Sequence, residues 1–118
     1  MNIRDILNLY KEDPRVANLA KAVNTSKNPR IQLKGLIGSS DAVIAISLYF
    51  LQHRHMVFVL PEREEAAYFQ SDLENLLEKE VLFFPASFRK AFEFTQTDSA
   101  NVLQRAEVLN ELSHSSEF

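Results

Sequence analysis

The chain has 118 residues, of which 46% are hydrophobic, 25% are charged and none is cysteine. This length and apolar content predict one compact domain and exclude intrinsic disorder, and the lack of cysteine excludes disulfides and thiolate metal sites. Thirteen basic and sixteen acidic residues give a net charge of −3, which argues against a dedicated nucleic-acid-binding module, because such a module carries a concentrated basic stripe.

Two short amphipathic helices are predicted at the start of the chain. Apolar residues keep helical spacing between Ile3 and Tyr10. Pro14 suits the first turn of a second helix, which ends at the polar run of residues 24–29. We therefore assign residues 1–29 to an N-terminal helical extension.

The remainder, residues 30–118, shows an alternation of strand and helix patterns. Strands are predicted where apolar residues alternate or run together, at residues 30–36, 56–60 and 81–84. Helices are predicted over residues 41–52, 61–77 and 100–112. Two βαβ units predict an α/β fold: a small three-layer, doubly wound parallel sheet, like a fragment of a P-loop NTPase or helicase domain, preceded by the two short helices.

Two of these elements are expected to be deeply buried. The helix at residues 41–52 is apolar nearly all round, so protein is expected to cover it on most sides. The strand at residues 56–60 is continuously apolar, which is typical of a strand buried on both faces. Because the chain ends after a helix where another strand is expected, we interpret it as part of a longer polypeptide.

The loop before the helix at residues 41–52 is the candidate site, because open parallel sheets bind ligands at the carboxyl ends of their strands. It reads Gly35-Leu36-Ile37-Gly38-Ser39-Ser40-Asp41-Ala42. Compared with the phosphate-binding pattern G-x-x-x-x-G-K-[ST], Ser40, Asp41 and Ala42 replace the second glycine, the lysine and the hydroxyl residue. A carboxylate repels phosphate and alanine cannot bind magnesium, so we predict a degenerate phosphate loop without catalytic residues.

No metal site is predicted. The last two predicted strands end in Leu60-Pro61 and Phe84-Pro85, so neither offers a carboxylate for magnesium at its end. His53 and His55 flank a guanidinium group and have no third ligand nearby in the sequence, so we interpret them as ordinary surface histidines.

Several of these segments together resemble the N-terminal, UvrB-like segment of bacterial transcription-repair coupling factors. In chain order they are the loop from Gln32 to Ser40, the apolar helix, Val57-Phe58-Val59-Leu60-Pro61, Leu82-Phe83-Phe84-Pro85 and Arg105-x-x-Val108-Leu109. The resemblance extends over residues 30–112. In that family the segment carries a degenerate phosphate loop in place of the working one.

The resemblance implies a role for a longer parent protein rather than an activity of this chain. Family members displace RNA polymerase stalled at DNA damage with an ATP-driven motor, which uses magnesium, and recruit UvrA for nucleotide excision repair. UvrA is bound mainly by an insert that follows this segment, so it is expected to bind this chain weakly if at all. RNA polymerase and DNA are contacted by other parts of the parent. This segment is expected to contact the remaining domains and to need no cofactor.

The connector after the third predicted strand is a second candidate, a surface for contact with a neighbouring domain. Its residues are Phe88, Arg89, Lys90, Phe92 and Phe94. Burial in the core is the ordinary role of such phenylalanines, and contact with a neighbouring domain or stacking on bases are the functional alternatives for this cluster. The basic pair is expected to be solvated, with an interdomain salt bridge as its functional alternative.

These features predict a non-catalytic module that acts through interdomain or protein contacts in transcription-coupled repair. The alternative is a stand-alone nucleotide-binding or phosphoryl-transfer enzyme with an atypical phosphate loop. The longest apolar run, from Ala42 to Leu51, is shorter than the ~20 residues of a membrane span. No secretory signal is recognised at the start of the chain, so the expected location is the cytoplasm, without membrane contact.

Overall fold

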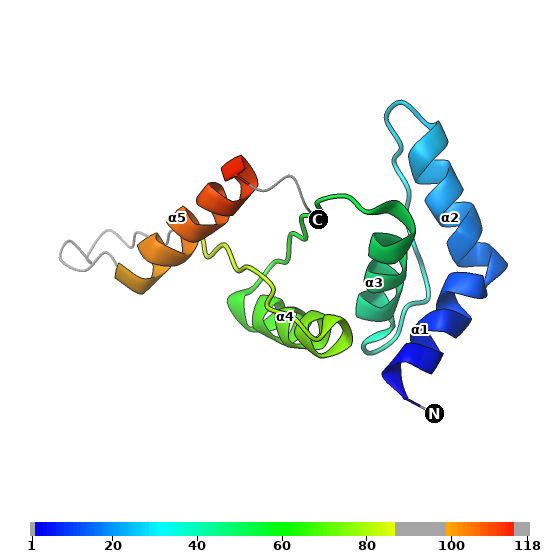
Figure 1. The fold of residues 1–118 in the computed structure, drawn as a ribbon, viewed down its shortest axis with the longest axis horizontal. Helices are drawn as coiled ribbons and strands as arrows, with labels where there is room; N and C mark the ends of the chain where they lie inside the picture. Colours follow the sequence, from blue (N-terminus) through cyan, green and yellow to red (C-terminus); the bar gives the residue numbers. More distant parts are fainter. Residues whose placement is uncertain (1, 87–98, 115–118) are drawn as a thin grey trace.

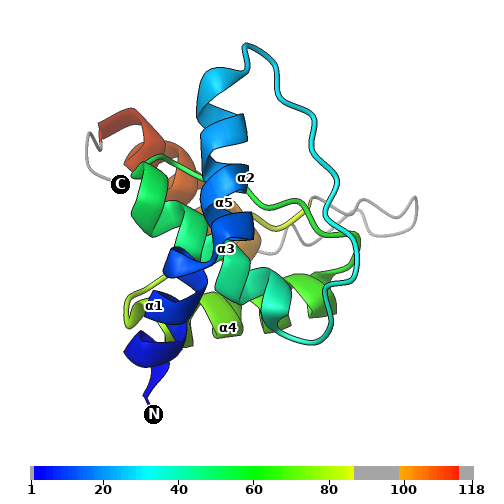
Figure 2. The same cartoon turned by 90° about the vertical axis from the view of Figure 1, so that its right-hand side faces the viewer.

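The computed structural model describes residues 2–86 and 99–114, which form five α-helices (Figure 1). They are α1 (Ile3–Glu12), α2 (Pro14–Thr25), α3 (Ser40–Gln52), α4 (Arg63–Leu77) and α5 (Ser99–His114). Helix α3 is central, because α1, α2 and α4 all pack against it (Figures 1 and 2). Helix α5 follows at the other end of the molecule (Figure 1).

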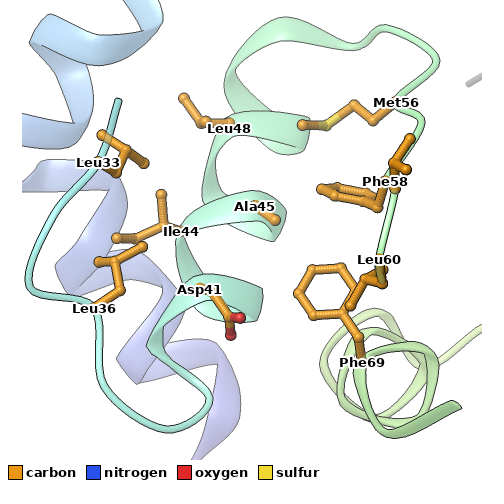
Figure 3. Close-up of a pocket in the computed structure, with 11 residues that line it drawn as sticks. Leu33, Leu36, Asp41, Ile44, Ala45, Leu48, Met56, Phe58, Leu60 and Phe69 are labelled. Atoms are coloured by element: carbon orange, nitrogen blue, oxygen red, sulfur yellow. The ribbon is translucent and has the colours of Figure 1, made fainter. Parts of the chain in front are cut away.

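The predicted parallel sheet is wrong, because residues 2–86 and 99–114 contain no strand and the described chain is all-helical. Residues 31–36, 56–60 and 81–84 lie outside the helices, but they form no backbone ladder with one another or with other described residues. Paired strands must lie about 4.8 Å apart. Residues 31–36 and 56–60 instead approach α3 from two sides (Figure 3), so a groove separates them.

The first two helices are fixed by capping residues. At the start of α1 the side chain of Asn2 accepts a hydrogen bond from the backbone N–H of Asp5 at 2.9 Å, and the Asp5 carboxylate accepts one from Asn2 N at 3.0 Å. Asp13 both ends α1 and caps α2, where it accepts a hydrogen bond from Arg15 N at 2.8 Å. Pro14 occupies the first turn of α2, where a missing N–H costs nothing.

The core lies between α1, α3 and α4. Its buried cluster consists of Leu7, Ala42, Ala45, Ile46 and Leu73. Protein was expected to cover the central helix on most sides; it covers the face that carries Ala42, Ala45 and Ile46, whereas Phe50 and Leu51 are 37% and 40% exposed. Removal of such apolar side chains from water is the main favourable contribution to folding, at about 25 cal/mol per Å².

The predicted burial of residues 56–60 on both faces is wrong. The side chains of Val57 and Val59 are 79% and 92% exposed. Burial on both faces requires a sheet covered by helices on each side. This segment has α3 and α4 on one side only, where the centroids of the Phe58 and Phe69 rings lie 5.0 Å apart.

Two helices end in left-handed residues that are not glycine. His53 follows α3 with φ 50°, and Glu78 follows α4 with φ 56°. Each donates its backbone N–H to a carbonyl of the preceding turn, Tyr49 O and Glu74 O respectively. At the end of α3, Gln52 Nε2 donates a hydrogen bond to Ala20 O at 3.0 Å, and this bond holds α3 to α2.

Candidate functional site

The predicted phosphate loop forms a tight turn that leads into α3. Gly35 and Gly38 both have positive φ, 82° and 59°, which favours glycine. An added Cβ would meet no atom within 4 Å at either position, so the requirement is for backbone conformation rather than for space. The turn is closed by Ser40, whose Oγ accepts a hydrogen bond from Ile37 N at 2.8 Å and whose N–H donates to Ile37 O at 3.2 Å.

The six predicted loop residues lie together at this turn, but they point in different directions. Ser39 occupies the cap position of α3 and makes no capping hydrogen bond through its side chain. Asp41 is exposed, and its Oδ1 accepts a hydrogen bond from Ala42 N at 2.7 Å. Ala42 is 0% exposed and belongs to the core.

The electrostatics of this turn are set by Asp41. The first turn of a helix carries partial positive charge and free N–H groups, which attract anions. The Asp41 carboxylate already stands in that turn and uses one of those N–H groups. A phosphate at the same place would meet a negative charge instead of the ammonium group that a working loop supplies.

A groove beside α3 was not predicted from the sequence. It has a volume of about 340 Å³. Its floor is formed by Ile44, Ala45 and Leu48 of α3, with Phe69 of α4 at one end (Figure 3). Its walls are formed by Leu33 and Leu36 on one side and by Met56, Phe58, Val59 and Leu60 on the other. The sequence signal for this groove is the apolar pattern of the two wall segments, which predicts strands of one sheet.

The groove is apolar apart from one carboxylate. Among the described residues that line it, Asp41 alone is charged, and it lies at the same end as Leu60 and Phe69 (Figure 3). The degenerate loop and the groove therefore share a residue, and Asp41 faces any ligand that enters from that end.

The other candidate residues are placed elsewhere or lie outside the described part of the chain. Phe88, Arg89, Lys90, Phe92 and Phe94 lie outside the described residues. His53 ends α3, and no three His, Cys, Asp or Glu side chains of the described residues form a group that could hold a metal ion. Within residues 2–86 and 99–114, no helix combines the length and the apolar character that crossing a membrane requires.

No protein-family model, curated protein or solved structure matches this chain.

Proposed function

We propose that this chain is a non-catalytic module of a transcription-repair coupling factor and that it acts by contact with protein. The observation that carries the proposal is the pair Asp41 and Ala42 at the start of α3. One is an exposed carboxylate at the position of the phosphate-binding lysine, and the other is a buried methyl group at the position of the magnesium-binding hydroxyl.

The size of the electrostatic effect supports this proposal. Two unit charges 4 Å apart interact by about 4 kcal/mol at the effective dielectric constant of ~20 that applies near a protein surface. Replacement of lysine by aspartate turns that attraction of a phosphate into repulsion of similar size. Hydrogen bonds from the free N–H groups of one helix turn are too weak to offset such a change.

The surroundings of the loop favour protein contact over small-molecule chemistry. The groove beside Asp41 is apolar, and neighbouring Val57 and Val59 are almost fully exposed. Apolar surface of this kind is typical of sites where a protein partner binds.

The wider role rests on the resemblance to the coupling-factor family. In that setting the parent protein works in the cytoplasm, where its motor displaces stalled RNA polymerase and its other domains contact DNA and recruit UvrA. The present chain contacts the remaining domains of the parent, and UvrA binds it weakly if at all.

Calorimetric titration with ATP and magnesium tests the non-catalytic part of the proposal. We expect no saturable heat of binding at millimolar ATP. Binding with micromolar affinity would overturn the proposal in favour of a nucleotide-binding or phosphoryl-transfer enzyme with an atypical loop.

Sequencing the complete transcript that encodes this chain tests the wider role. We expect a downstream motor region in the same reading frame with an intact G-x-x-x-x-G-K-[ST] loop. A transcript that encodes no such motor would contradict the assignment to a coupling factor.

A further inference from the structure

The two walls of the groove are chain segments outside the helices, and their backbone groups are unused between described residues. Between described residues, the backbones of residues 31–36 and 56–60 form no hydrogen bond. An extended backbone with free N–H and C=O groups is a template for pairing with another strand. Both walls therefore offer backbone hydrogen bonds to whatever lies in the groove.

The placement of the two walls suits a single strand. The walls lie on either side of the α3 face that carries Ile44 and Leu48 (Figure 3). A helix with its side chains is about 10–12 Å across, and neighbouring strands lie about 4.8 Å apart. Two segments that flank one helix leave room for one strand laid along the helix face between them.

The lining specifies the side chains of that strand. Ile44 and Leu48 on the floor and Leu33 and Phe58 on the walls are apolar, so the strand must present apolar residues at alternate positions, those that face α3. Its other residues face away from the helix. A lipid tail would also suit the floor, but it would leave the backbone groups of both walls without partners.

The charge at one end gives the strand a direction. Asp41 lines the groove beside Leu60 and forms no ion pair with a described residue. One of its oxygens bonds to Ala42 N, and the other is left for a ligand. A lysine or arginine near one end of the strand would complement this carboxylate.

We propose that this groove binds one extended segment of a partner protein, apolar at alternate residues and basic at the end that reaches Asp41. This inference rests on the proposed function, because it names the kind of partner that a protein-contact module would bind. The binding mode is strand addition, in which backbone hydrogen bonds supply affinity and alternate side chains supply specificity.

Selection from a displayed library of random ten-residue peptides on the whole 118-residue chain tests this proposal. We expect enriched peptides with alternate apolar residues and a basic residue near one end. N-methylation of a central amide in such a peptide should weaken binding about tenfold, because it removes a backbone hydrogen bond and adds bulk. A library without enriched sequences, or binding that N-methylation leaves unchanged, would overturn the proposal.

Two exposed substitutions locate the bound peptide without disturbing the core. Asp41→Lys should weaken the selected basic peptides about tenfold and favour peptides with an acidic residue in the same place. The matched control is Leu103→Lys on α5, where the side chain is 70% exposed and does not line the groove; it should leave the affinity unchanged. Equal effects of the two variants would contradict binding in the groove.

Further measurements on the same protein distinguish a bound strand from other occupants of the groove. They also separate this proposal from the proposed function. Concentration-dependent dimers that exclude the peptides would assign the groove to a second copy of the chain. Binding of a fatty acid with no peptide selected would assign it to a lipid. Either result overturns the strand proposal alone, whereas saturable ATP binding overturns the non-catalytic function independently.

Discussion

Asp13 joins two helices through one carboxylate. It accepts hydrogen bonds from Arg15 N at 2.8 Å, from Nε at 3.1 Å and from Nη2 at 2.9 Å. These bonds to the Arg15 side chain, followed by the bond from its backbone, lower the pKa of Asp13 from 3.8 to about 2. The charged carboxylate is therefore the form that the fold favours.

The pKa of Asp13 predicts a pH dependence of stability. Because the folded pKa of about 2 lies below the ordinary value of 3.8, the contribution is fully present above pH 3.8 and is lost as the pH falls through 2. Asp13→Asn keeps an oxygen for Arg15 N–H and loses the charge. We expect the melting temperature of this variant, followed by circular dichroism, to vary less with pH over that range than that of the parent chain. Equal pH dependence in both proteins would contradict this assignment.

Restoring the phosphate-loop residues should not create an enzyme. In the double variant Asp41→Lys, Ala42→Thr the new hydroxyl enters the core, because position 42 is 0% exposed. Overpacking of this kind costs about 1–3 kcal/mol, and the hydroxyl remains out of reach of a bound metal. We expect no phosphate release above background with ATP and magnesium. Measurable turnover by a variant with intact helical content would contradict the placement of Ala42.

At the scale of elements, Leu73 is the buried residue of α4, and Phe69, Leu76 and Leu77 of the same helix pack against the core around it. Leu73 is 3% exposed and packs in the cluster that includes Ala45 and Ile46 of α3. We expect Leu73→Ala to lower the free energy of unfolding by about 2–5 kcal/mol, through lost burial and the cavity left behind. Urea denaturation measures this loss. Leu103→Ala on the exposed face of α5 is the matched control and should change stability by no more than about 0.5 kcal/mol.

Helices were predictable from this sequence, but strand pairing was not. The signals for helices are local, because helical periodicity, Pro14 and the apolar stretch of α3 each involve residues that are close in the sequence. The observed helices start and end close to the predicted positions. The pattern of residues 56–60 was equally clear. Its pairing, however, depends on what lies beside it in space, and in this fold α3 and a groove are its neighbours.

The candidate site was predictable to the same limited degree. The sequence predicts a charged residue, Asp41, at the start of a helix, and in the structure Asp41 lies in the first turn of α3. Burial of Ala42 could not be read from the sequence, because the inward face of α3 is set by Leu7 and Leu73 on other helices. The groove was missed for a similar reason, since its walls are about twenty positions apart in the chain.

At the scale of the whole molecule, the described residues leave many large apolar side chains exposed. Large apolar side chains are exposed on residues 31–37, on residues 56–59 and along α5. Such a surface gives the molecule ample area for contact with other proteins.

The helices should differ in local stability, because they differ in how much they pack against the rest of the molecule. Helix α3 packs against three other helices, whereas α5 is held to residues 80–86 by Arg105, whose guanidinium carbon lies 5.1 Å from the centre of the Phe84 ring. A cation–π contact at an exposed site contributes only about 0.5–1 kcal/mol. We expect amide hydrogen exchange to be slowest in α3 and fastest in α5. Similar protection in both helices would show that α5 has further contacts.

The two left-handed helix ends are positions at which the stability of this protein can be raised. The chain contains only two glycines, and both serve the turn before α3. His53 and Glu78 therefore adopt a conformation that costs an ordinary residue roughly 1–2 kcal/mol. Glycine at these positions would relieve that strain at a smaller cost in chain entropy. A thermally tolerant version of this scaffold is thus accessible by two changes at positions that line neither the turn nor the groove.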